Sequence, residues 1–158
     1  MLAMLSARRR IVGVDYDAEK IETARHSFLR RPETEFVHAD LRTAELPEAD
    51  AFLLLDVLHY MQPEEQRGLI ERCAARLKAG GRIIIRDGDA GKAERHKTTA
   101  MTEVWSTKIV GFNKTDGELH FTSTPELQQT ARRLGLEIHA AHTDAHTSNT
   151  VYILTRPE

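Results

Sequence analysis

Apolar and polar residues follow two alternating local patterns along the chain. Short, nearly continuous apolar runs rich in β-branched residues predict strands that are covered on both faces, at residues 11–14, 35–37, 51–55, 82–85, 137–141 and 150–154. The segments between them are longer and carry apolar residues at helical spacing. Strands that alternate with helices predict an α/β domain with a doubly wound, mainly parallel sheet.

Three helices are predicted, at residues 18–29, 63–77 and 125–134. Their apolar residues, such as Ile21, Leu69 and Cys73, share the face that turns inward. The expected boundaries come from caps and helix breakers: Asp17 caps the first helix, Pro63 and Gly80–Gly81 bound the second, and Thr124 and Gly135 bound the third. We therefore expect Cys73 to be a core residue rather than a nucleophile.

The chain of 158 residues fits one domain, and we expect residues 1–158 to form it. Hydrophobic residues make up 41% and charged residues 29%, which is typical of a soluble globular protein. One stretch, residues 87–118, breaks the alternation because it is long, polar and weakly periodic. Loops of that length are usually lids or binding segments, so we expect this one to be a substrate-binding insertion.

Charge and cysteine content narrow the partners and the compartment. Lys and Arg total 22 against 24 Asp and Glu, a formal charge of −2, so no broad attraction to nucleic acid or to an anionic membrane is expected. Cys73 is the single cysteine, which excludes an internal disulfide and favours a reducing compartment. No apolar run is long enough to span a membrane, and the first ten residues reverse the order of a secretory signal. We expect a cytoplasmic protein.

Acidic residues follow the first two predicted strands, at the edge of the sheet where such folds bind ligands. Asp15 is placed to accept both hydroxyl protons of a ribose, or else it is a turn or capping residue. Asp40 is placed to accept a hydrogen bond from an adenine amino group, or else it closes a turn. These two carboxylates are the candidates for binding a nucleoside.

The third and fourth strands end in further polar groups. Asp56 is followed by His59 and Tyr60, which are either a proton acceptor and substrate contacts, or a capping histidine and a packing aromatic. Arg86 either pairs with Asp87 or Asp56, or holds a substrate carboxylate. The sequence leaves both choices open.

Taken in order, these motifs resemble class I S-adenosylmethionine-dependent methyltransferases. Val12-Gly13-Val14-Asp15, His38-Ala39-Asp40 and Leu55-Asp56-Val57-Leu58-His59-Tyr60 are similar to the second, third and fourth motifs of that family. Residues 77–85 resemble its turn into the fifth strand. Residues 136–142 and 150–155 resemble its terminal antiparallel hairpin. The resemblance implies a Rossmann-like sheet that ends in this hairpin.

It also implies roles for individual residues. Asp15 would hold the ribose of S-adenosylmethionine with Tyr16 beside the adenine, Asp40 and Leu41 would frame the adenine ring, and Asp56 would lie near the methionine end. Residues 86–114 would be the variable substrate region, with contacts from Arg86, His96, Thr98, Glu103, Trp105, Phe112 and Asn113. The implied reaction is methyl transfer to a small-molecule oxygen, nitrogen or carbon nucleophile. The candidates for a base are His59, Tyr60 and His96, and no metal is required.

The sequence departs from the family at its beginning. Neither the first strand of the family nor the glycine-rich turn after it precedes the segment that ends at Asp15, and residues 1–6 are similar to the end of the following helix. We therefore expect an N-terminally truncated domain with two unpaired strand edges, one beside each of the strands that end at Asp15 and Asp56. A shortened chain, a strand supplied by another chain, or direct pairing of the two edges would each explain the difference. Pairing through these edges would make the chain a homodimer.

Two other functions remain open. A dinucleotide-dependent oxidoreductase shares the acidic residue after a strand, but it needs a Gly-x-Gly-x-x-Gly turn about 20 residues before Asp15. A non-catalytic binding scaffold with a methyltransferase-like fold would tolerate the loss of the glycine loop. Residues 88–92 do not complete a phosphate-binding loop, and the His139, His142, Asp144 and His146 cluster matches no closed zinc motif.

Overall fold

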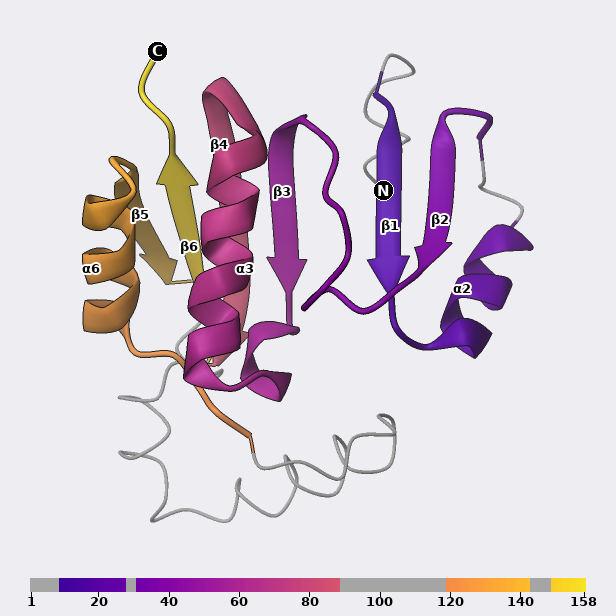
Figure 1. Cartoon of the computed structure of the whole chain (residues 1–158), viewed down its shortest axis with the longest axis horizontal. Coiled ribbons are helices and arrows are strands. Elements are labelled where there is room, and N and C mark those ends of the chain that lie inside the picture. Colours follow the sequence, from indigo (N-terminus) through magenta and orange to yellow (C-terminus); the bar gives the residue numbers. More distant parts are fainter. Residues whose placement is uncertain (1–8, 28–30, 89–118, 143–148) are drawn as a thin grey trace. The chain divides into compact units, whose positions relative to one another are not determined.

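The computed structural model describes residues 9–27, 31–88, 119–142 and 149–158 (Figure 1). The chain divides into two compact units, Met1–Glu45 and Leu46–Glu158. Each unit has its own sheet, of two and of four strands. That residues 1–158 act as one domain stays a prediction.

The first unit is a strand–helix–strand motif. Strands β1 (Ile11–Asp15) and β2 (Thr34–His38) pair in parallel, and helix α2 (Ala18–Arg25) connects them. Asp17 caps α2 as predicted, because its side chain accepts from the amides of Glu19 and Lys20. The buried side chain of α2 is Ile21, which is 3% exposed. Helix α2 ends earlier than residue 29, since the amide of Ser27 turns back to the Ala24 carbonyl (3.2 Å).

The second unit has a four-stranded sheet in the order β3-β4-β6-β5. Strands β3 (Ala49–Leu55) and β4 (Leu77–Gly88) are parallel, whereas β6 (Asn149–Thr155) is antiparallel to both β4 and β5 (Glu137–His142). The 3-10 helix η1 (Leu58–Tyr60) and helix α3 (Pro63–Arg76) connect β3 to β4, and helix α6 (Thr124–Arg133) precedes β5. The predicted α/β fold with a C-terminal antiparallel hairpin is confirmed.

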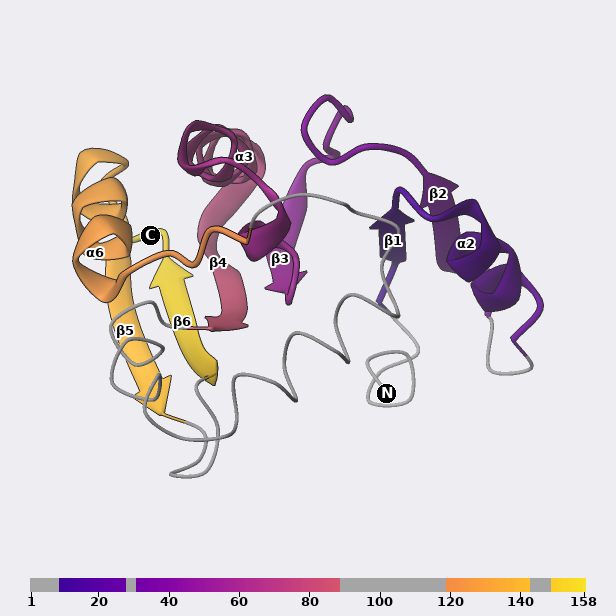
Figure 2. The same cartoon turned by 90° about the horizontal axis from the view of Figure 1, so that it is seen from below.

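Helices α3 and α6 lie side by side over one face of this sheet (Figures 1 and 2). Their apolar residues meet the inward face of the strands, where the largest side chains that are at most 1% exposed are Tyr152, Leu58, Leu69, Ile70, Ile83, Ile85, Leu127 and Leu154. Cys73 is in this core, as predicted, and burial raises the pKa of its thiol to about 12. The thiol is therefore protonated at neutral pH and is no nucleophile.

Two further helix boundaries were predicted wrongly, in addition to the end of α2. Ser123, not Thr124, caps α6: its extended backbone precedes Thr124, and both its amide and its hydroxyl bond to the Glu126 carboxylate (3.0 and 2.8 Å). Gly80 and Gly81 do not end α3, because β4 already begins at Leu77. They lie in a bulge of β4, where the register jumps from Ala49–Leu77 to Ala51–Arg82 and Gly80 adopts a φ of +68°.

Unpaired strand edges were expected beside the strands that end at Asp15 and Asp56, which are β1 and β3. Among the described strands, β1 pairs with β2 alone and β3 with β4 alone, so each has one edge without a partner strand. Strand β1 belongs to the two-stranded sheet of the first unit, and β3 belongs to the four-stranded sheet of the second unit. Within the described residues, no helix is long and apolar enough to cross a membrane.

Two neighbouring leucines of β3 provide a test of this arrangement. Leu54 faces the helices and is 5% exposed, whereas Leu55 points the other way and is 47% exposed. Leu54→Ala should lower the free energy of unfolding by about 2–5 kcal/mol, since it removes buried methyl groups and leaves a cavity. Leu55→Ala should cost less than about 1 kcal/mol. Urea unfolding of the two variants measures the difference, and equal losses would contradict the assigned faces.

Candidate active site

Asp15 lies where β1 ends, opposite His38 at the end of β2. Its Oδ1 accepts from the amide of Asp17 (2.9 Å), and its own carbonyl accepts from the amide of Ala39 (3.0 Å). His38 Nε2 donates to the carbonyl of Tyr16 (2.8 Å). These bonds fix the backbone on both sides of the half-buried Asp15 carboxylate, and no described residue donates to its Oδ2. The geometry leaves this oxygen for a hydroxyl donor of a ligand.

The side chains of Tyr16 and Leu41 lie near the carboxyl ends of β1 and β2, as Asp15 does. Tyr16 is 41% exposed, which is unusual for a large aromatic residue, and Leu41 is half-buried. A flat aromatic ring and an aliphatic side chain are the groups expected to contact a purine base. Asp15, Tyr16 and Leu41 thus fit a nucleoside in the first unit.

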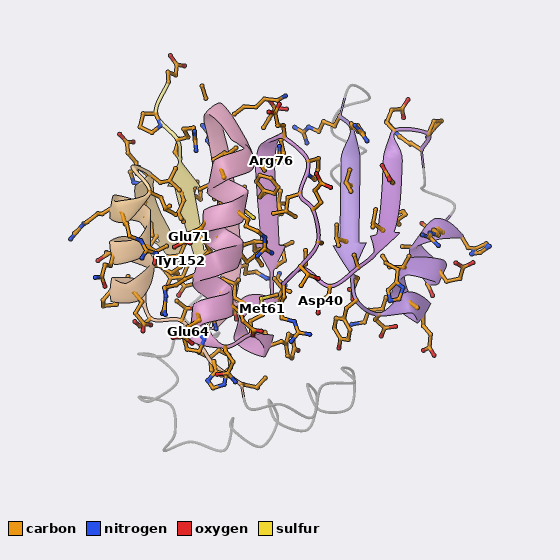
Figure 3. All side chains as sticks on the ribbon, viewed as in Figure 1. Asp40, Met61, Glu64, Glu71, Arg76 and Tyr152 are labelled. Atoms are coloured by element: carbon orange, nitrogen blue, oxygen red, sulfur yellow. The ribbon has the colours of Figure 1, made fainter. Side chains whose placement is uncertain are left out.

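Asp40, labelled in Figure 3, follows β2, and its carboxylate already has hydrogen-bond donors in this structure. Its carboxylate accepts from the backbone amide of Arg42 (2.9 Å) and from the Arg42 guanidinium, with Nε at 3.0 and 2.9 Å and Nη2 at 2.6 Å. Because a carboxylate has about four lone-pair positions, this fork uses most of its acceptor capacity. A hydrogen bond from an adenine amino group to Asp40 stays a prediction. The adenine would have to share the Asp40 carboxylate with Arg42.

Asp56 and Arg86 form an ion pair at the ends of β3 and β4. Arg86 Nε lies 3.2 Å from Asp56 Oδ1, and Nη2 bonds to Oδ2. The hydrogen bond to Asp56 raises the pKa of the Arg86 guanidinium above its usual value. Asp56 has a φ of +53°, a conformation that aspartate tolerates better than most residues, and its amide donates to the Arg86 carbonyl (2.8 Å). Of the two readings of Arg86, the structure supports pairing with Asp56.

His59 and Asp87 form a buried pair, each 3% exposed. His59 Nδ1 lies 2.5 Å from Asp87 Oδ1. Oδ1 also accepts from the amide of Gly88 (2.8 Å), while Oδ2 accepts from the amides of Leu58 (3.1 Å) and His59 (3.2 Å). In a neutral imidazole, a carboxylate bonded to Nδ1 holds the proton on that nitrogen, so that Nε2 carries the lone pair. Nε2 is buried and has no hydrogen-bond partner in the described part of the chain.

Aromatic rings enclose the imidazole of His59. The Tyr60 ring lies 4.1 Å away, centroid to centroid, at an interplanar angle of 49°. The Phe121 ring lies 5.4 Å away at 30°. His59 is therefore a desolvated imidazole whose Nδ1 is hydrogen-bonded and whose buried Nε2 has no partner among the described residues. The ring of Tyr60 packs against it, which fits the packing role that the sequence left open for Tyr60.

Several predicted site residues lie outside the described residues: His96, Thr98, Glu103, Trp105, Phe112 and Asn113. Asp144 and His146 of the histidine cluster also fall there, and the described ranges hold no group of three or more His, Cys, Asp and Glu side chains that could bind a metal ion. A cavity of about 550 Å³ lies between α3 and α6, lined by residues such as Gln66, Arg67, His120 and Arg133. Its lining includes none of the predicted site residues that the structure describes.

From the sequence, Asp87 was predicted only as a possible partner of Arg86. Its burial could have been predicted from the alternation of side chains along β4, because Ile83, Ile85 and Asp87 occupy alternate positions and point to the same buried face. An aspartate on a core face needs donors, and the histidine after the neighbouring strand supplies one. No comparable pattern marks Phe121, since its contact with His59 depends on the tertiary fold.

A sequence profile of the O-methyltransferase domain family matches residues 10–121. Among curated proteins, the chain is 30% identical to the carboxy-S-adenosyl-L-methionine synthase of Mannheimia succiniciproducens over 93 residues, 52% of this chain and 39% of that protein. The corresponding enzyme of Photobacterium profundum is 32% identical over 93 residues, with 52% of this chain and 38% of that protein covered. The chain thus spans about two fifths of the length of these relatives.

Solved structures agree. An O-methyltransferase family protein from Burkholderia thailandensis is 28% identical, with a TM-score of 0.59 over 79% of this chain and 36% of that one. Human N-acetylserotonin methyltransferase, solved in complex with S-adenosylmethionine, is 19% identical, with a TM-score of 0.69 over 99% of this chain and 43% of that one. The second likeness shows that the chain shares the fold of that methyltransferase.

Proposed function

The chain belongs to the O-methyltransferase domain family, and we propose that it transfers the methyl group of S-adenosylmethionine to a small-molecule nucleophile. S-adenosylmethionine, the cofactor of the family, supplies a methyl group that the sulfonium charge already activates. The protein then has three tasks: to bind the nucleoside, to align the acceptor and to take a proton where the acceptor must lose one. The acceptor itself is proposed as a class only.

The observation that carries this proposal is the buried pair of His59 and Asp87. With Nδ1 hydrogen-bonded to Asp87 at 2.5 Å, the imidazole presents the lone pair of Nε2, which no described residue occupies. That is the protonation state a general base requires. We therefore assign proton acceptance to His59 and its orientation to Asp87, while base roles for Tyr60 and His96 have no comparable support.

Asp15, Tyr16, Asp40 and Leu41 are the residues of the first unit that we propose to hold the nucleoside part of the cofactor. Asp15 supplies the ribose acceptor, because its Oδ2 is not engaged by a described residue, and Tyr16 offers an exposed ring beside it. Asp56 belongs to the second unit, where it pairs with Arg86, and its place near the methionine end of the cofactor stays a prediction from the sequence. The non-catalytic scaffold differs from this proposal in one respect: it would bind the nucleoside without turnover.

Binding of the cofactor product tests the first half of the proposal. Calorimetric titration with S-adenosylhomocysteine should give a dissociation constant that rises about tenfold or more in Asp15→Asn, since a hydrogen bond to a charged acceptor contributes about 1.5–3 kcal/mol. Asp17→Asn is the matched control, because asparagine caps a helix as well as aspartate and the affinity should not change. Equal affinities of Asp15→Asn and the unmodified chain would contradict the ribose assignment.

Turnover tests the second half. In assays with labelled S-adenosylmethionine and a panel of phenols, hydroxy acids and amines, His59→Gln should lower kcat by about 10²-fold or more, the usual contribution of a general base. The affinity for S-adenosylhomocysteine should stay the same, since His59 is not assigned to cofactor binding. If the unmodified chain binds S-adenosylhomocysteine but methylates none of these compounds, the scaffold is the better description.

A further inference from the structure

A buried side-chain amide connects three segments beside His59. Gln66, in the second turn of α3, is 4% exposed. Its Nε2 donates to the carbonyls of Met61 (3.0 Å) and His120 (2.6 Å), and its Oε1 accepts from the Thr122 hydroxyl. Both donors and the acceptor of the amide are therefore used, and its partners lie up to 56 positions away in the sequence.

Two of these partners lie directly next to the residues around His59. Met61 follows η1, and its amide closes that turn on the Leu58 carbonyl (2.9 Å). The amide of His120 donates to the carbonyl of His59 (2.9 Å), so residues 119–122 run beside η1. Gln66 adds side-chain bonds to this backbone contact and fixes residues on both sides of Phe121.

Phe121 is held from a second direction by Gly88. A Cβ atom on Gly88 would lie 2.8 Å from Cδ1 and from Cε1 of the Phe121 ring, closer than any side chain allows. The ring thus rests on the backbone directly after Asp87, with the imidazole of His59 5.4 Å away on another side. If Phe121 moved, the environment of both members of the buried pair would change.

We propose that Gln66 is a positioning residue for His59. By fixing His120 and Thr122, its amide holds Phe121 between Gly88 and the imidazole, which keeps water from the Nδ1–H···Asp87 hydrogen bond and keeps Nε2 in one orientation. The geometric part stands on the contacts of the described residues alone. Its consequence for catalysis rests on the proposed function, in which His59 accepts the proton.

Exchange of the His59 Nδ1 proton with water, followed by NMR on chain labelled with nitrogen-15 in histidine, measures this role. The unmodified chain should show a slowly exchanging Nδ1–H signal. In Gln66→Leu the exchange should be faster by at least about tenfold, because buried groups left without partners favour local opening. Gln129→Leu, which removes an exposed amide from the neighbouring helix α6, should leave the rate within about twofold.

Thr122 gives a second, milder pair of variants. Thr122→Val removes the hydroxyl that bonds Gln66 and should speed the exchange, while Thr122→Ser keeps the hydroxyl and should restore the original rate. A folded Gln66→Leu with unchanged exchange overturns the proposal. If Gln66→Leu does not fold, the Thr122 variants decide the question, and equal exchange rates in Thr122→Val and Thr122→Ser overturn the proposal. The proposal is also overturned if the unmodified chain shows no slowly exchanging Nδ1–H signal.

The proposed function fails on a different observation. If no S-adenosylhomocysteine binds and no methyl transfer is found, the NMR result still stands as a statement about His59. If turnover is found, Gln66→Leu should lower kcat while the KM for S-adenosylmethionine stays unchanged. A purely structural role of Gln66 would lower the amount of folded protein without that selective effect.

Discussion

The second unit depends on the carboxylate of Asp87. Its two oxygens accept from three backbone amides and from His59 Nδ1, and it is almost fully buried. Burying a carboxylate costs several kcal/mol, so such a group persists only where donors replace the water that it loses. Here the donors come from η1 and from the strand itself, and the same bonds fix η1 against the end of β4. The Asp87 carboxylate therefore both holds η1 in place and orients the imidazole of His59.

The position of an acidic residue at the end of a strand does not by itself determine its chemical role. Asp15, Asp40 and Asp56 all lie at carboxyl ends of strands. Asp15 bonds a backbone amide and keeps one oxygen without a described donor, Asp40 is bound by the Arg42 fork, and Asp56 pairs with Arg86. The partner of each carboxylate, more than its place in the sheet, determines which chemistry it can perform.

Periodicity was enough to predict the strands and the core position of Cys73. Glycine as a helix breaker predicted the end of α6 at Gly135, which has a φ of +67°. These boundary signals failed where residues of similar chemistry compete, as Ser123 and Thr124 do for the cap of α6, and where a glycine pair lies in a bulge rather than at a helix end. Asp87 was accessible through strand parity. Gln66 was not, because its partners His120 and Thr122 become neighbours only after β4 and α3 have packed.

The tautomer of His59 is the most direct test of this account. Nitrogen-15 NMR of the histidine side chains distinguishes a protonated ring nitrogen from one that carries a lone pair. In the unmodified chain at neutral pH, His59 should carry its proton on Nδ1 and a lone pair on Nε2, and Asp87→Asn should lose this preference. A proton on Nε2, or the same tautomer with and without the Asp87 carboxylate, would contradict the assignment of His59 as the proton acceptor oriented by Asp87.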